Sequence, residues 1–238
     1  MVFSDDMITP LASVLVNRLT GSRTIITRKM QTPPSLTYDQ KLKLDDLAER
    51  LIAAEEPVTI LIDGHEPEIS EYLIKKLPNA RVVMDGGSLR ASNIKLAAWT
   101  DYFVVSEHFA RDYMSYRSLS TEAEIKAALI ELNKICRGEA FITLGEKGCA
   151  FLKSGMLQIV PSWLCNAVDT TGAGDVFHGA FTYGVHYSWH IDNIILFASL
   201  TAAISIEKKG VRESMPDLAV VHHSLNNYER NLKQYFEE

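Results

Sequence analysis

Short apolar runs alternate with amphipathic segments along the middle of the chain. The runs are continuous, and they occupy residues 58–63, 81–84, 102–105 and 141–144. Between them, apolar residues recur at helical spacing over about 39–54, 66–77, 91–99, 107–116 and 121–137. A continuous apolar run such as 58–63 is typical of a strand that is buried on both faces. The alternation predicts a parallel, doubly wound α/β sheet with ligands at the carboxyl ends of its strands.

Two other patterns predict hairpins. The runs at 13–17 and 24–27 flank the turn residues 19–22, and the runs at 149–152 and 156–160 flank Lys153-Ser154-Gly155. We expect the second hairpin at an edge of the sheet. The stretch Thr32-Pro33-Pro34-Ser35 is the one hinge-like segment. The predicted domains are therefore a β-hairpin segment over residues 1–31 and an α/β core over residues 32–238.

The last part of the chain is predicted to be helical. Three helices are expected, over about 173–190, 192–208 and 216–236. Asp192 is the expected N-cap of the second helix, because its side chain can accept hydrogen bonds from first-turn N–H groups. Pro216 suits the first turn of the third helix, where its missing N–H costs nothing.

Composition narrows the function classes. The 238 residues carry 24 Lys and Arg against 30 Asp and Glu, which gives a net charge of −6, and the basic residues form no stripe. This balance argues against nucleic acid as a partner. No apolar run approaches the roughly 20 residues that span a membrane. The cysteines Cys136, Cys149 and Cys165 have no CxxC spacing, which favours reduced thiols in a cytoplasmic protein.

The stretch from Asp169 to Asp175 carries the clearest chemical signal in the chain. It reads Asp-Thr-Thr-Gly-Ala-Gly-Asp and leads directly into a predicted helix. Glycines let the backbone approach a ligand closely, and the N–H groups of a helical first turn form an anion site. We expect Gly172, Ala173 and Gly174 to bind a phosphate there. Asp175 would be repelled by that phosphate unless it takes a proton from an attacking hydroxyl group. The loop therefore predicts phosphoryl transfer to an alcohol.

The string from Asp169 to Phe181 resembles the C-terminal signature of the ribokinase-like, or PfkB, carbohydrate kinases. Phe141-Ile-Thr-Leu-Gly-Glu-Lys-Gly148 is similar to that family's strand and loop over the nucleotide. Lys209-Gly210, followed by Ser214-Met215-Pro216, is similar to the loop and helix start that close its adenine pocket. The resemblance covers nearly all of the chain. It implies a ribokinase-like three-layer α/β/α fold, a mostly parallel central sheet, a remnant of a small β lid and an ATP-dependent sugar kinase.

The resemblance also assigns residues to ligands. Those it places around ATP are Gly145, Glu146, Lys147, Gly148, Ala198, Ala202 and Gly210. It gives Asp169 and the Thr171 carbonyl to a monovalent cation such as K⁺, and it lets the lid-strand Arg23 reach toward the substrate. The family often carries Asn-x-x-Glu after the strand at 102–105, whereas this chain has Ser106-Glu107-His108-Phe109. Mg²⁺ would then be held largely by nucleotide phosphates and water, with Glu107 helping only indirectly.

One part of the family pattern has no counterpart in this chain. Family members begin with a strand that carries a sugar-binding aspartate, followed by a Gly-Gly loop and an Asn that contact the acceptor. Gly86-Gly87 does not replace that loop, because it follows a mid-chain strand. The chain therefore resembles a member that is truncated at its N-terminus. We expect it to bind ATP, to phosphorylate sugars poorly, and to expose an apolar edge near residues 58–63 or 24–27.

The acceptor is the least determined part of the sequence interpretation. The Ser106 variant resembles the ketohexokinase-like branch, which indicates transfer to a hydroxymethyl group of a small sugar such as a ketose. A nucleoside kinase of the same family stays open as an alternative, because the acceptor-reading residues belong to the missing elements. A non-catalytic nucleotide-binding remnant also stays open. The resemblance further allows a homodimer that forms through the lid.

Overall fold

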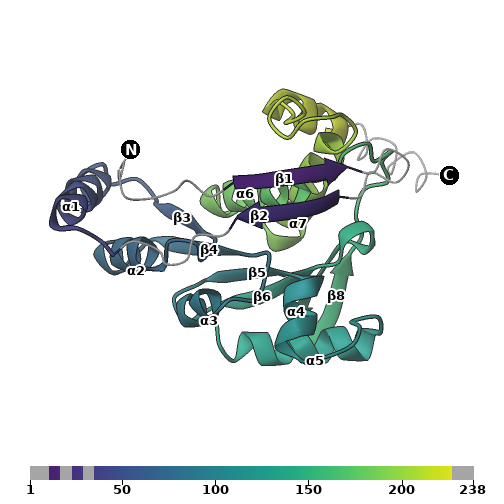
Figure 1. Cartoon of the computed structure of the whole chain (residues 1–238), viewed down its shortest axis with the longest axis horizontal. Coiled ribbons are helices and arrows are strands. Elements are labelled where there is room, and N and C mark those ends of the chain that lie inside the picture. Colours follow the sequence, from purple (N-terminus) through teal and green to yellow (C-terminus); the bar gives the residue numbers. More distant parts are fainter. Residues whose placement is uncertain (1–10, 17–22, 29–34, 227–238) are drawn as a thin grey trace.

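The computed structural model describes residues 11–16, 23–28 and 35–226. Its main sheet has six strands in the order β3-β4-β5-β6-β7-β8 (Figure 1). The parallel part consists of β3 (Thr59–Ile62), β4 (Arg81–Gly86), β5 (Tyr102–Ser106) and β6 (Glu139–Thr143). β7 (Cys149–Lys153) and β8 (Met156–Val160) complete the sheet as an antiparallel hairpin. The prediction of a mostly parallel sheet with a hairpin at its edge is confirmed.

Helices cover both faces of this sheet, as the three-layer prediction requires (Figure 1). One core lies under α2 (Pro67–Lys76), α3 (Ala91–Ala97), α4 (Glu107–Tyr113) and α5 (Glu122–Asn133). The other lies under α6 (Ala173–His186) and α7 (Ile191–Ser205). Val82 and Met84 of β4 point into the first core and Val83 into the second, because side chains alternate across a strand. The predicted anion loop lies where the start of α6 meets the carboxyl edge of the sheet.

The apolar run at 58–63 is not buried on both faces. β3 lies at the end of the strand order, and its Leu61 side chain is 43% exposed. Its apolar composition resembles that of a central strand, but an edge strand has a neighbour on one side only, so burial depends on topology. The expectation of an exposed apolar edge here is confirmed. The helix α1 (Tyr38–Ala53) also leaves Leu42 and Ile52 exposed, because only part of its apolar stripe packs against α2.

The predicted N-terminal hairpin is present. β1 (Leu11–Val16) pairs antiparallel with β2 (Arg23–Arg28) in a separate two-stranded sheet. Its turn at 17–22 lies outside the described residues, as does the side chain of Arg23, so the predicted substrate contact of Arg23 stays a prediction.

Helix ends differ from the predictions by a few residues. α6 ends at His186, and α7 begins at Ile191 with His190 as its N-cap, so Asp192 lies inside the first turn. The last helix spans residues 218–226 within the described part, and the Asp217 carbonyl accepts its first N–H bonds. Pro216 therefore precedes this helix. No helix in the described ranges is long and apolar enough to cross a membrane.

Candidate active site

The glycine-rich loop over residues 169–172 lies between the β7–β8 hairpin and α6, and its contacts restrict the conformation of its backbone. Gly172 is the N-cap of α6 with a φ of 76°, a left-handed conformation that side chains rarely adopt. A Cβ atom there would also lie 2.5 Å from Cγ1 of Val211. The Asp169 carboxylate accepts N–H bonds from Thr171 at 3.0 Å and from Gly210 at 3.3 Å. Asp169 thus ties the loop to the segment around Gly210 that the sequence assigned to the adenine pocket.

The first turn of α6 presents unpaired donors to solvent. The Ala173 N–H is donated to the Thr170 carbonyl at 3.3 Å, so it is occupied in this structure, contrary to the expectation that it binds an anion. The N–H groups of Gly174 and Asp175 have no acceptor among the described residues. Gly174 is exposed, and a Cβ atom placed on it would meet no protein atom within 4 Å. These two donors sit at the positive end of the helix dipole, where anions bind favourably.

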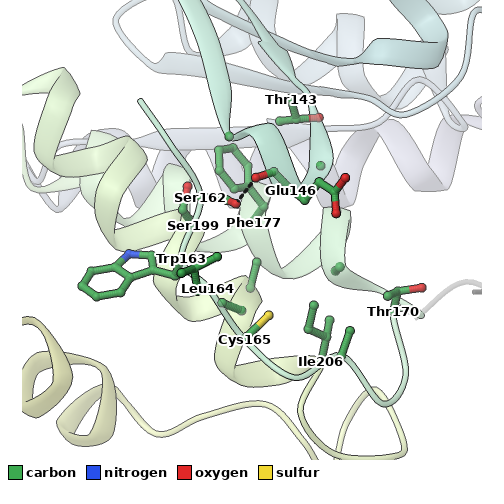
Figure 2. A pocket seen from close by; sticks show the side chains of 17 residues that line it. Thr143, Glu146, Ser162, Trp163, Leu164, Cys165, Thr170, Phe177, Ser199 and Ile206 are labelled. Carbon is green, nitrogen blue, oxygen red and sulfur yellow. Dashed lines mark hydrogen bonds between the residues drawn. The ribbon is translucent and has the colours of Figure 1, made fainter. Parts of the chain in front are cut away.

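A cavity of about 580 Å³ opens beside this turn (Figure 2). Its walls come from the end of β6 and the following short 3-10 helix η1 (Gly145–Lys147), the irregular segment 162–167, α6 and α7. The volume lies in the range of small-molecule and cofactor sites. The α7 wall consists of Ser199, Ala202 and Ala203, and Ile206, the C-cap of α7, continues it. Small residues at this helical spacing leave room for a flat ligand against the helix.

The structure brings together some of the predicted nucleotide residues but not all of them. Those that line the cavity are Gly145, Glu146, Gly148 and Ala202. Ala198 is fully buried in the core under α7, which rules out direct contact with a ligand in this cavity. Lys147 and Gly210 are absent from the cavity walls. A Cβ atom at Gly148 would lie 2.0 Å from the Val160 carbonyl oxygen, so the packing of β7 against β8 by itself requires glycine there.

The sequence interpretation missed most of the cavity wall. Trp163, Leu164 and Cys165 line it from the irregular segment after β8, and Phe177 lines it from α6 (Figure 2). Leu164 is fully exposed, and the indole N–H of Trp163 donates to the Leu196 carbonyl at 3.2 Å. Only the spacing of small residues along α7 offered a signal in the sequence. The segment 162–167 has no periodicity that would indicate a binding wall.

Carboxylates gather at the strand ends beside the first turn of α6. Asp175 is exposed at the third position of that helix, and Asp85 stands at the end of β4. Burial raises the pKa of the Asp85 carboxyl group, His178 lowers it, and the neighbouring charges of Asp175 and Asp63 raise it further. Asp85 and His178 were not predicted as site residues. The signal was a charged residue at the carboxyl end of a buried strand, which is where ligands bind in such sheets.

The end of β5 is joined to the loop after β4. The Ser106 hydroxyl donates to the Gly87 carbonyl at 2.9 Å and accepts the Phe109 N–H at 3.0 Å, which caps α4. Glu107 is half-buried in the first turn of α4. The predicted helper for Mg²⁺ thus lies at the same edge of the sheet as Asp85, one strand away.

A model of the pfkB family carbohydrate kinases matches residues 86–218. A ribokinase from Lactococcus lactis is 29% identical over 192 residues, which cover 79% of this chain and 60% of that protein. A deoxyribokinase from Salmonella typhi is 31% identical over 131 residues, which cover 55% of this chain and 42% of that protein. The chain thus spans less than two thirds of the length of these curated relatives.

Solved structures extend the match to the fold. A ribokinase from Arabidopsis thaliana in complex with ribose and ATP superposes with a TM-score of 0.68. Its sequence is 21% identical, and the match covers 89% of this chain and 67% of that chain. At this identity the likeness establishes the fold, and it confirms the predicted ribokinase-like architecture.

Proposed function

The chain belongs to the pfkB family of carbohydrate kinases, and from that premise we propose that it transfers the γ-phosphoryl group of ATP to a hydroxyl group of a small sugar. One observation carries the proposal. The unpaired N–H groups of Gly174 and Asp175 lie in the first turn of α6, where Gly174 lines the cavity and Asp175 carries an exposed carboxylate. An anion site next to a base suits transfer of a phosphoryl group to an alcohol.

The chemistry assigns a role to each group. The Asp175 carboxylate takes the proton of the sugar hydroxyl group as its oxygen forms a bond to the γ-phosphorus. The bond from the γ-phosphorus to the bridging oxygen breaks, and its electron pair leaves with ADP. The N–H groups of Gly174 and Asp175 face the charge that spreads over the phosphoryl oxygens in the transition state. Preorganised donors of this kind contribute about 2.7–4 kcal/mol each.

The cavity is the proposed ATP site. Ala202, Ala203 and Ile206 would contact the adenine from α7, and Gly145 and Glu146 would lie over the ribose and phosphates. The Arabidopsis thaliana ribokinase with bound ribose and ATP supports ATP as the phosphoryl donor. The main contribution of the protein is to position ATP and the sugar, because phosphoryl transfer requires little covalent chemistry from protein groups.

The residues present fit the metal ions that the family implies. Within the described part of the chain, the Thr171 Oγ1 atom is buried and has no hydrogen-bond partner, and Thr171 lies two residues from Asp169. We propose that Asp169 and the Thr171 carbonyl hold a monovalent cation, which would supply positive charge beside the anion loop. Among the described residues, no three His, Cys, Asp or Glu side chains converge on a point that could hold a metal. We propose that Mg²⁺ would be held mostly by nucleotide phosphates and water, with Glu107 helping only indirectly.

The acceptor that the relatives support best is a pentose. Their names specify ribose and deoxyribose, and none of the relatives described above supports the ketose expected from Ser106. We therefore propose ribose or deoxyribose as the first acceptors to test. Their hydroxymethyl group offers the primary alcohol that Asp175 would deprotonate.

The test compares two aspartates in the first turns of neighbouring helices. Asp175→Asn should abolish ADP formation in the presence of ribose or deoxyribose while leaving ATP affinity nearly unchanged, because only proton removal is lost. Asp192→Asn is the matched control, since Asp192 lies in the first turn of α7 and contacts Lys153 instead. Phosphorylated sugar is identified by phosphorus NMR. Retention of most of the activity by Asp175→Asn would contradict the assignment of the base.

A further inference from the structure

His178 is a polar residue on the buried face of α6. Its side chain is only 3% exposed, and its neighbours on that face are Phe177, Ala180 and Phe181. The ring contacts three segments at once. Nδ1 lies 2.6 Å from the Gly174 carbonyl oxygen and 3.2 Å from Oδ2 of Asp85, and Nε2 lies 3.1 Å from the Val104 carbonyl oxygen. The ring therefore connects the first turn of α6 to the end of β4 and to the middle of β5.

The contacts determine the charge of this ring. A carbonyl oxygen only accepts hydrogen bonds, so Nε2 must carry a proton toward Val104 and Nδ1 must carry one toward Gly174. A neutral ring would hold a bare lone pair against an oxygen 2.6 or 3.1 Å away. With a proton on both nitrogens the His178 ring would be an imidazolium, and Asp85, whose Oδ2 atom lies 3.2 Å from Nδ1, is the carboxyl group placed to be its counterion. The remaining charged groups near the pair are Asp175 on α6 and Asp63 after β3.

The Gly174 carbonyl links this ion pair to the phosphate site. It belongs to the same peptide unit as the N–H of Asp175, one of the two unpaired donors in the first turn. A hydrogen bond donated to the oxygen of a peptide unit polarises the unit and makes its N–H a stronger donor. Because His178 is anchored on the sheet, its bond to Gly174 also fixes the direction in which that N–H points.

Building on the function proposed above, we propose that His178 and Asp85 are a positioning pair for phosphoryl transfer. The charged ring holds and polarises the Gly174–Asp175 peptide unit toward the γ-phosphoryl group of ATP, and Asp85 keeps the ring charged and oriented. Neither residue touches the nucleotide. Their effect is therefore expected on the γ-phosphoryl group alone and not on the adenine end of the cavity.

The experiment replaces the ion pair by two neutral amides in the double variant Asp85→Asn/His178→Asn. Changing both partners avoids leaving one buried charge without its counterion. The control is His186→Asn, the same substitution at the other end of α6, where the ring is within hydrogen-bond distance of the Thr59 hydroxyl and packs edge-on against the Tyr187 ring. Calorimetry measures the affinities for adenosine, ADP and a non-hydrolysable ATP analogue. Steady-state kinetics with ribose measures kcat and KM.

The double variant should bind adenosine and ADP like the wild type and lose about tenfold of its preference for the ATP analogue over ADP. Its kcat should fall by a similar or larger factor with the KM for the sugar unchanged, since the loss of a whole donor costs roughly 10²–10³. An unchanged preference and kcat would overturn the positioning role. A wild-type protein that fails to bind the ATP analogue, or an active Asp175→Asn variant, would instead count against the proposed function.

A second measurement does not depend on folding of the variant. In wild-type protein labelled with ¹⁵N-histidine, long-range proton–nitrogen correlation distinguishes protonated from bare ring nitrogens, and the nuclear Overhauser contact of the His178 ring with the Phe177 ring identifies the signal. Two protonated nitrogens that persist at neutral pH support the imidazolium. One bare nitrogen at His178 would refute the pair even if the double variant did not fold.

Discussion

Replacing Gly174 with alanine should separate phosphate binding from folding. Gly174 lies in the first turn of α6 with a helical backbone, and a Cβ atom there meets no protein atom within 4 Å. Alanine in a helix is favoured over glycine by roughly 0.5–1 kcal/mol. The variant should therefore melt at the same temperature as the wild type or higher, by about 1–4 °C. Any loss of function cannot then be attributed to the fold.

The added methyl group would occupy the face through which a phosphoryl group reaches the N–H groups of Gly174 and Asp175. If one of these donors is lost to the transition state, the cost is about 2.7–4 kcal/mol, or roughly 10²–10³ in kcat. Adenosine affinity should not change, because the adenine end of the cavity is formed by α7 and the segment 162–167. Calorimetry with adenosine, ADP and an ATP analogue, together with kcat, measures both effects.

Two other glycines serve as controls. Gly179 lies on the exposed side of the same helix and also has open space where a methyl group would be added, so Gly179→Ala should gain stability and keep full activity. Gly172→Ala should lose stability, because a left-handed residue costs about 1–2 kcal/mol and the methyl group would overlap Val211. If Gly174→Ala kept the kcat and the ATP preference of Gly179→Ala, the first turn of α6 would not be the phosphoryl site.

Two further predictions concern the cavity and the thiols. ATP should change the fluorescence of Trp163, which lines the cavity with its indole fixed on Leu196, and Trp163→Phe should remove that change; a response that survives this variant would place the nucleotide elsewhere. Burial raises the pKa of the Cys136 thiol to about 11, from an ordinary value of 9.0. The unfolded chain then releases this proton first, so the melting temperature should fall as pH rises from about 9 to about 11, and Cys136→Ala should reduce that fall, whereas an identical pH profile for the variant would contradict it.

The helices and strands of the core could be predicted from the spacing of apolar residues, because an element with a buried face repeats its apolar residues at the period of that element. The position of a strand within the sheet did not follow. The run 58–63 has the composition of a central strand, yet β3 stands at the edge with Leu61 exposed. Which strands flank β3 depends on pairing between distant segments, and local composition carries no information about that pairing.

The residues of the site also divide into those that could be predicted from the sequence and those that could not. The anion loop was predictable because its chemistry is local: glycine spacing, a helical first turn and an acid within seven residues. The wall formed by Trp163, Leu164 and Cys165 was not, because an irregular segment becomes a wall only when α7 folds opposite it. Even within the loop, the Thr170 carbonyl decides that the Ala173 N–H is occupied. That bond depends on backbone geometry that residue types alone do not determine.

The pair of Asp85 and His178 shows how a sequence pattern can predict a contact between segments that are far apart in the chain. The two residues are far apart in the sequence, and each is ordinary by itself, an acid after a strand and a histidine in a helix. What relates the two residues is the face of the helix on which His178 lies and the strand end on which Asp85 lies. His178 interrupts the apolar face with which α6 packs on the sheet, and a buried polar ring requires partners there. The strands facing α6 must then supply acceptors, and Asp85 is the acidic side chain that stands at the end of such a strand. A polar residue on a predicted core face therefore predicts a partner on the opposing layer, and at the carboxyl edge of a parallel sheet that partner lies beside the ligand.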